Sequence, residues 1–180
     1  VLDGAMRAFW ARGYEGTSVA DLVAATGINR GSLYAAFTGK RGLFLRALDH
    51  YDTRHRARFL DEIAQGHPPR EAIIEAFRRA AEPDVDTPSG CLLVNTALEL
   101  SPHDPEIGAF VQARLRGVED FFCDRIKAAR NDGSLRADLP PRRTAQGLLA
   151  LFLGLRVLCR ASPDAAATDA IITQAERMLA

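Results

Sequence analysis

The chain has 180 residues, of which 47% are hydrophobic and 26% are charged. This composition is typical of one or two globular domains and excludes a low-complexity chain. The 23 basic and 23 acidic side chains balance, which argues against a uniformly basic protein that coats nucleic acid.

The charges are unevenly distributed along the chain. Residues 1–50 carry six Lys or Arg and four Asp or Glu side chains, whereas residues 51–180 carry seventeen and nineteen. The three cysteines are too few and too far apart for a disulfide framework, and no basic-then-apolar leader opens the sequence, so we expect a reducing, cytoplasmic setting. The longest apolar run, LLALFLGL at 148–155, is far shorter than the roughly 20 residues that span a bilayer. We therefore expect no membrane association.

Apolar residues recur with helical spacing throughout, which predicts an all-α protein. The first helix is expected at Leu2–Arg12, before Gly13. Ser18 and Asp21 form a capping-box pattern that begins a second helix, which ends near residue 26. Asn29 is a favourable N-cap for a third helix at Arg30–Phe37. These three helices make up the front of the chain.

Six further helices follow. A long fourth helix is predicted from about residue 40 to Gly66, and proline and glycine then mark the boundaries of the others. We expect these at about residues 69–82, 91–100, 105–130, 142–161 and 164–179.

The second and third helices, joined by a short turn that contains Gly27, have the arrangement of a helix-turn-helix, whose second helix lies in the DNA major groove. Backbone N–H groups are free in the first turn of a helix, so Arg30, Gly31 and Ser32 are placed to reach phosphates and base edges. Arg30 could bond a guanine, and Tyr34 offers a hydroxyl to the DNA backbone. The side chains expected to face inward are Leu33, Ala36 and Phe37. A small three-helix subdomain without DNA binding has the same local pattern.

Residues 14–51, YEGTSVADLVAATGINRGSLYAAFTGKRGLFLRALDHY, resemble the DNA-binding domain of the TetR family of bacterial transcriptional regulators. The resemblance implies a helix-turn-helix domain at residues 1–45 and an all-helical regulatory domain, for effector binding and dimerisation, at residues 46–180. It also implies contacts to phosphate from Thr17 and Ser18, to the operator from Arg30, Ser32 and Tyr34, and to phosphate from Lys40.

The sequence departs from the family pattern at three positions. Ala35 and Ala36 stand where many relatives carry an aromatic residue and a histidine, so the operator preference of those relatives cannot be transferred. Arg41 replaces the usual acidic residue after the lysine and could add a phosphate contact.

The last two predicted helices are expected to form the dimer interface, as they do in the family. Residues 148–158 are apolar almost all round, and Gly147 and Gly154, seven residues apart, place two small residues on one stripe where another helix can approach. The alternative is a helix buried inside its own monomer. The residues predicted for the interface are Gly147, Leu151, Gly154, Leu158 and Ile172.

The resemblance implies an effector pocket among the middle helices. Several phenylalanines lie there, although aromatic residues at helical spacing are more often core than pocket. Cys91, Asn95 and Glu99 recur every four residues as one polar stripe, which is either functional or simply faces solvent. The residues predicted for the pocket or sensor are Cys91, Asn95, Phe59, Phe77, Phe110 and Phe121.

Cys91 suggests a thiol-based alternative. It lies in the first turn of its predicted helix, where the helix dipole favours a thiolate, and Gly-Cys at this point resembles a subgroup of the family that includes sensors of electrophiles or oxidants. Cys123 and Cys159 lie in apolar stretches and are expected to be buried and inert.

The sequence contains no catalytic or cofactor motif. The four histidines lack metal-ligand spacing, no phosphate-binding glycine loop occurs, and the carboxylates are scattered. We therefore expect no enzyme activity, metal or cofactor. The sequence predicts a homodimeric DNA-binding regulator, most simply a repressor that leaves a palindromic operator when a small-molecule effector binds. A helical protein-interaction module without DNA binding is the alternative from another class.

Overall fold

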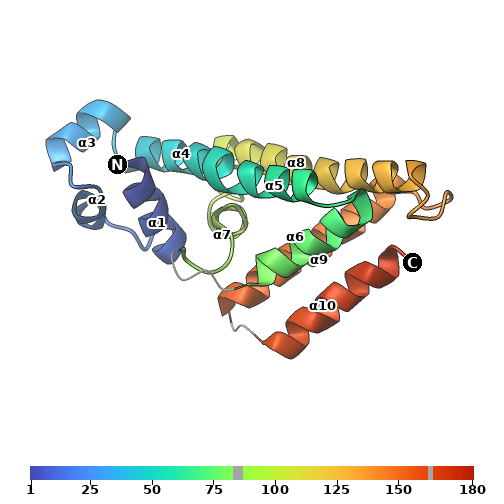
Figure 1. The fold of residues 1–180 in the computed structure, drawn as a ribbon. Helices are drawn as coiled ribbons and strands as arrows, with labels where there is room; N and C mark the ends of the chain where they lie inside the picture. Colours follow the sequence, from blue (N-terminus) through green and yellow to red (C-terminus); the bar gives the residue numbers. More distant parts are fainter. Residues whose placement is uncertain (83–86, 162–163) are drawn as a thin grey trace. The chain divides into compact units, whose positions relative to one another are not determined.

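A computed structural model describes residues 1–82, 87–161 and 164–180. All regular secondary structure in this part of the chain is helical, which confirms the predicted fold class (Figure 1). The predicted boundary around residues 83–90 falls partly outside the described residues. The helices are α1 (Leu2–Arg12), α2 (Val19–Thr26), α3 (Arg30–Phe37), α4 (Lys40–Tyr51), η1 (Asp52–Ala57), α5 (Arg58–Gly66), α6 (Pro69–Ala81), α7 (Leu92–Glu99), α8 (Pro105–Asn131), α9 (Pro141–Ala161) and α10 (Ala165–Met178).

The chain divides into two compact units. Unit 1 contains Val1–Arg58 and Asp84–Val111, and unit 2 contains Phe59–Pro83 and Gln112–Ala180. The α8 helix therefore contributes its beginning to unit 1 and its remainder to unit 2. The predicted boundary between residues 45 and 46 separates the DNA-binding region from the regulatory region. It does not coincide with the division into compact units, and it stays a prediction.

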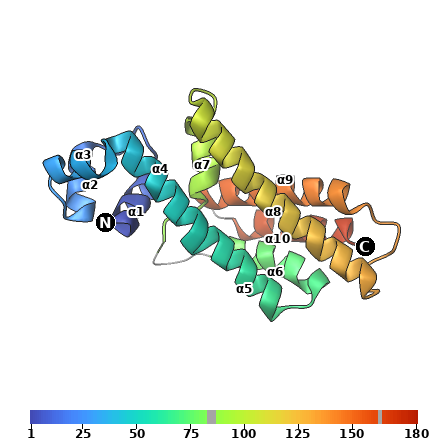
Figure 2. The same ribbon diagram turned by 90° about the horizontal axis from the view of Figure 1, so that it is seen from above.

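Unit 1 is built around α1 and α4. The α1 helix packs against α2 and α4, α3 packs against α2 and α4, and α7 contacts α1 and α4. Figure 2 shows α2 and α3 side by side. The fully buried large side chains that hold these helices together are Met6, Phe9, Leu22, Leu33, Leu43, Phe44, Leu48 and Leu92.

The predicted helix starts in unit 1 have the expected capping bonds. The Ser18 side chain accepts a hydrogen bond from the Asp21 N–H, and the Asp21 carboxylate accepts one from the Ser18 N–H, which completes the capping box. The Asn29 side chain accepts a hydrogen bond from the Ser32 N–H at 2.8 Å. Gly27 ends α2 in the left-handed conformation, with φ of 72°. Local sequence therefore determines both ends of the turn between α2 and α3.

The predicted long fourth helix is helical over its whole length but not uniformly α-helical. A π-helical segment, η1, separates α4 from α5. Asp52, buried in this segment, forms an ion pair with Arg56 one turn later. Apolar spacing alone did not reveal this segment, because the helical pattern continues on both sides of it.

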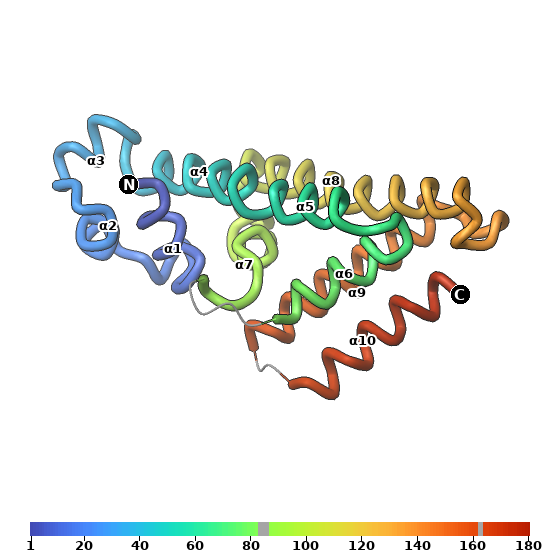
Figure 3. The backbone as a smooth tube through the Cα atoms, viewed as in Figure 1, coloured from blue at the N-terminus to red at the C-terminus, as the bar shows by residue number. Residues whose placement is uncertain are grey.

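In unit 2, α6, α9 and α10 contact one another (Figure 3). Its core contains three phenylalanines from three helices. The ring centroid of Phe77 lies 5.8 Å from that of Phe122 and 5.4 Å from that of Phe152, and the last two are 5.7 Å apart. Such tilted and edge-to-face contacts add to the stabilisation from apolar burial.

The α9 helix is long and apolar enough, by length and composition, to cross a membrane. Core helices pass the same test, and 33% of its most apolar stretch is buried within the protein. Contacts with α6 and α10 cover that buried part. The length and composition of α9 are therefore weak evidence for a membrane span.

Candidate DNA-binding surface

The first turn of α3 is open to solvent. Arg30, Gly31 and Ser32 are all exposed, and the Asn29 cap engages only the Ser32 N–H. The N–H groups of Arg30 and Gly31 come before that of Leu33, the first to bond a carbonyl of the helix, so they are available as donors for an anion. A Cβ on Gly31 would meet only Asn29 Oδ1, at 3.4 Å. The packing of the protein therefore does not require glycine here, whereas close approach of a DNA backbone would.

The outer face of α3 continues with Tyr34, whose side chain is 47% exposed. The Arg30 guanidinium lies 5.8 Å from the centroid of the Tyr34 ring, so these two predicted contact residues share one face, a helical turn apart. Leu33 is fully buried and Phe37 is half-buried. Ala36 was predicted to face inward but is exposed, because this two-turn helix buries only the stripe that contains Leu33 and Phe37.

The two residues predicted to bind phosphate at the start of α2, Thr17 and Ser18, differ in exposure. Ser18 is exposed, and its hydroxyl donates to the Asp21 carboxylate at 2.6 Å. This bond is the main reason that the pKa of Asp21 is lowered, and the Ser18 N–H contributes further. Thr17 is fully buried, and its hydroxyl donates to the Gly13 carbonyl at 2.7 Å. The prediction that the Thr17 side chain contacts phosphate is therefore not supported, because its hydroxyl braces the preceding turn.

The start of α4 has no side-chain cap. Its first N–H groups are thus available to an anion beside the ammonium of Lys40. That ammonium lies over the Tyr14 ring, 4.2 Å from the centroid. Tyr14 also makes an edge contact with Phe44, with ring centroids 4.9 Å apart. Sequence reasoning missed Tyr14, because no spacing rule connects it to Lys40.

Arg41 does not supply the additional phosphate contact that its position suggested. Its guanidinium bonds the Asp104 carboxylate at 2.9 Å and the Glu106 carboxylate at 2.5 Å. These bonds, with Glu106 the larger contributor, raise the pKa of Arg41. The charge of Arg41 is thus neutralised within unit 1, by residues more than sixty positions away in the sequence.

The polar stripe of α7 does not simply face solvent. Cys91 is the half-buried N-cap residue, and its thiol accepts a hydrogen bond from the Tyr51 hydroxyl at 3.3 Å. The Asn95 amide nitrogen is buried and has no hydrogen-bond partner in the described part of the chain. Glu99 accepts hydrogen bonds from the backbone N–H groups of Tyr14 and Glu15. Cys91 and Glu99 therefore contact other helices and turns of unit 1, the same unit that contains α7.

The predicted pocket phenylalanines are dispersed. Phe77 is fully buried in the core of unit 2, which is the alternative that helical spacing favoured. Phe59 is partly buried beneath the Arg79 guanidinium, which lies 5.5 Å from its ring centroid. Phe121 makes an edge contact with Phe122 at 5.4 Å, and Phe110 is half-buried in unit 1.

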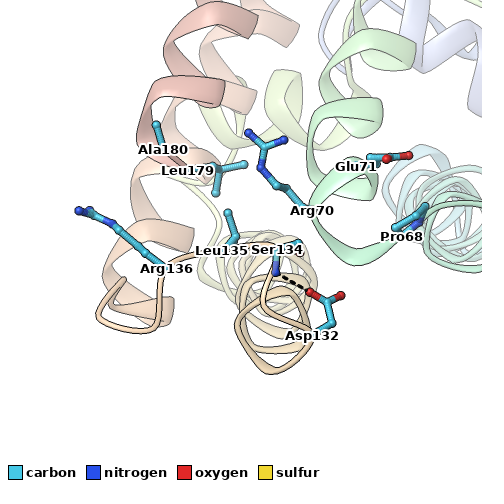
Figure 4. A pocket seen from close by; sticks show the side chains of 9 residues that line it. All are labelled: Pro68, Arg70, Glu71, Asp132, Ser134, Leu135, Arg136, Leu179 and Ala180. Atoms are coloured by element: carbon cyan, nitrogen blue, oxygen red, sulfur yellow. Dashed lines mark hydrogen bonds between the residues drawn. The ribbon is translucent and has the colours of Figure 1, made fainter.

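The described part of unit 2 includes two cavities relevant to effector binding. One, of about 500 Å³, is shown in Figure 4, where the Ser134 N–H donates to Asp132 at 2.9 Å; its lining is Pro68, Arg70, Glu71, Asp132, Ser134, Leu135, Arg136, Leu179 and Ala180. The other, of about 870 Å³, is lined by Arg78, Ala81, Glu82, Cys159, Asp164, Ala165, Thr168, Asp169, Ile172 and Thr173. None of the six predicted effector residues lines either cavity. Cys159 was expected to be buried and instead lines the larger one, whereas Cys123 is buried as predicted.

The predicted dimer residues lie on α9 and α10. A Cβ on Gly147 would come within 2.4 Å of Met178 Cε in the same chain, so α10 already occupies that side of the helix. Gly154 faces open space: among the described residues, an added Cβ would meet no atom of another element within 4 Å. Val157 and Leu158 beside it are 41% and 42% exposed. Leu151 and Ile172 are half-buried.

Among the described residues, no group of three or more His, Cys, Asp and Glu side chains is arranged to hold a metal ion. His50 instead bonds the Asp3 carboxylate at 2.7 Å, joining α4 to α1. This bond is the main cause of the lowered pKa of Asp3.

Comparison with known proteins identifies the family. Residues 1–47 match the description "Bacterial regulatory proteins, tetR family", and residues 68–175 match "Tetracyclin repressor-like, C-terminal domain". The HTH-type transcriptional repressor ComR of Escherichia coli is 34% identical over 170 residues, covering 88% of this chain and 77% of ComR. The uncharacterised HTH-type transcriptional regulator YezE of Bacillus subtilis is 33% identical over 140 residues, covering 77% and 72%.

A solved structure extends the comparison to a DNA complex. A cysteine mutant of the TetR family transcriptional regulator CifR, complexed with 26bp double-strand operator DNA, is 32% identical. The match covers 99% of this chain and 93% of the CifR chain, with a TM-score of 0.84. The matched family descriptions, the curated relatives and the CifR structure all agree with the helix-turn-helix described above. The chain therefore belongs to the TetR family, and it is a DNA-binding transcriptional regulator of the repressor type.

Proposed function

We propose that two copies of the chain bind an inverted-repeat operator, with α3 of each copy in one of two successive major grooves. The observation that carries this proposal is the first turn of α3, where the Arg30 guanidinium, the Ser32 hydroxyl and the first backbone N–H groups of the helix stand together at an exposed surface. A cysteine mutant of CifR, which has the same fold and is 32% identical to this chain, was solved as a complex with operator DNA.

The proposed contacts divide into base reading and phosphate binding. Arg30 reads a base edge, most simply guanine, and Ser32 bonds a neighbouring base or phosphate. Tyr34 gives its hydroxyl to the backbone on the same face. Ser18 at the start of α2 and Lys40 at the start of α4 bind phosphates, which fix the register but carry no sequence information.

We further propose that the dimer forms through α9 and α10. The open stripe around Gly154, Val157 and Leu158 is apolar, and a second copy of the same stripe would cover it. Dimerisation must then separate the two α3 helices by about 34 to 36 Å, one turn of DNA, so that both enter the operator.

Gly154→Leu is expected to disrupt the dimer. The added Cβ would meet no other element within 4 Å in the part of the chain that the structure describes, but the leucine would push a partner helix away from the stripe. Sedimentation velocity should show a shift from dimer to monomer, and operator affinity should fall by at least about tenfold because each half-site then binds alone.

Ala113→Leu is the matched control, because it adds the same leucine at an exposed position of α8. This variant should remain dimeric. A Gly154→Leu protein that sediments as an undisturbed dimer would place the interface elsewhere.

The chain is proposed to act as a regulator rather than an enzyme, in the cytoplasm, and to release its operator when a small molecule binds the regulatory domain. For release, the effector must bind the DNA-free conformation more tightly than the DNA-bound one. The unpartnered amide of Asn95 is a candidate contact for such a ligand, because a buried donor without a partner is costly until something bonds it.

A second candidate function is a thiol sensor centred on Cys91. The observation that favours it is the Tyr51 hydroxyl at 3.3 Å from the Cys91 sulfur, in a half-buried site one turn from Asn95. Cysteine reacts with electrophiles through its sulfur, and the Tyr51 hydroxyl is in direct contact with that atom.

If Cys91 is the sensor, its alkylation by N-ethylmaleimide should lower operator affinity. The experiment uses the Cys159→Ser background, because Cys159 is also accessible, and peptide mass mapping should show Cys91 labelled faster than the buried Cys123. Equal labelling of the two cysteines, or an unchanged response to the electrophile in Cys91→Ser, would exclude the sensor.

A further inference from the structure

The carboxylate of Glu99 accepts hydrogen bonds from the backbone of the turn between α1 and α2. Glu99 is the last residue of α7, and its two oxygens accept hydrogen bonds from the Tyr14 N–H at 2.9 Å and the Glu15 N–H at 2.8 Å. Tyr14 and Glu15 belong to the turn between α1 and α2, 85 and 84 residues earlier in the chain, respectively. Two successive N–H groups that converge on one anion form a strong anchor, since both bonds are charge-assisted.

The turn is shaped to admit this carboxylate. Gly13 has φ of 77° and ψ of 178°, a conformation that is essentially restricted to glycine. A Cβ at Gly13 would lie 2.8 Å from one Glu99 oxygen and 3.2 Å from the other. Gly13 therefore both allows the turn and leaves room for the incoming side chain.

The same turn supports a DNA-contacting charge. The Tyr14 ring lies below the Lys40 ammonium at 4.2 Å, a geometry in which a ring attracts a cation. Burial raises the pKa of Tyr14, so the phenol is neutral over the working pH range. Edge contact with Phe44 fixes the other side of the ring.

We propose that Glu99 is a positioning residue for operator binding, which acts through Tyr14 on Lys40. By bonding the Tyr14 N–H, Glu99 sets the place of the ring on which the Lys40 ammonium rests. Because Glu99 ends the helix that begins after Cys91 and contains Asn95, a shift of α7 would move this support. The inference rests on the proposed phosphate contact of Lys40.

Glu99→Gln is the first test, because positioning and simple electrostatics predict opposite signs. Removing a negative charge near DNA should by itself strengthen binding. Loss of the anchor should weaken DNA binding. In Glu99→Gln the amide oxygen can accept from one of the two N–H groups, but the amide NH₂ group then faces the other N–H and cannot accept from it. We expect operator affinity to fall about threefold to tenfold, the range of a lost cation–π support.

Two further variants serve as controls. Glu99→Asp keeps the charge but retracts the carboxylate, and it should weaken binding in the same direction. Glu106→Gln removes one charge from the start of α8 while Asp104 still holds Arg41, and it should leave affinity unchanged or slightly raised. The thermal unfolding midpoint of each variant should be compared with that of the original chain, so that affinities are compared only between folded proteins.

A double-mutant cycle with Lys40→Ala decides the mechanism. If Glu99 acts through Lys40, Glu99→Gln should have no further effect in the Lys40→Ala background, and each change should lower the salt slope of binding by up to about one. Additive effects of the two changes would overturn the positioning role. An unaltered affinity and slope in Lys40→Ala alone would instead refute the phosphate contact, so the two failures are distinguishable.

Discussion

Phe44→Ala is expected to lower the free energy of unfolding of the DNA-binding region by about 3 to 5 kcal/mol, the usual cost of removing a fully buried phenylalanine. Phe44 is 1% exposed, and its ring makes edge contacts with Phe9 and Tyr14, both with centroids 4.9 Å apart. The cavity would lie directly beneath the Tyr14 ring that supports Lys40. Chemical denaturation followed by circular dichroism would measure the loss.

Leu98→Ala is the comparison for Phe44→Ala. Leu98 is 71% exposed on α7, so its truncation should change stability by no more than about 0.5 kcal/mol. Equal destabilisation by the two substitutions would contradict the packing described for unit 1.

Arg30→Ala is expected to reduce operator affinity by about 1 to 3 kcal/mol and to remove the preference for one base pair in each half-site. Arg30 is exposed at the first turn of α3, so its loss should leave the fold intact. The measurement is a gel-shift titration of the operator and of the three duplexes that carry the other base pairs at the affected position.

Lys40→Ala is the matched change at a phosphate contact. It should weaken binding to all of these duplexes alike and lower the dependence on salt by about one unit. If both variants bind with the affinity and base preference of the original chain, α3 and the start of α4 do not form the DNA surface.

Local rules predicted the helix-turn-helix well because its structure is locally determined. The Ser18 capping box, the Asn29 cap and the left-handed Gly27 each depend on residues within a few positions. The exposed first turn of α3 follows from the same short stretch. Apolar periodicity also located the later helices, each of which buries one face.

The contacts that escaped prediction join residues far apart in the sequence. The Glu99 carboxylate meets a turn 84 and 85 residues earlier, and Arg41 meets Asp104, 63 residues later. No spacing pattern records such pairs. Burial explains two departures from prediction. The Thr17 side chain is buried, with its hydroxyl donating to the Gly13 carbonyl, and Ala36 is exposed because α3 is too short to bury a second stripe.

The central claim is that the α3 surface binds duplex DNA as one half of a two-fold pair. Its most direct test is selection of binding sites from a pool of random duplexes by the unaltered chain, followed by titration of the selected duplex at several salt concentrations. We expect an inverted repeat whose half-sites are centred about 34 to 36 Å apart, and an affinity that falls steeply as salt rises. Failure to enrich any inverted repeat, or binding that does not depend on salt, would contradict the account.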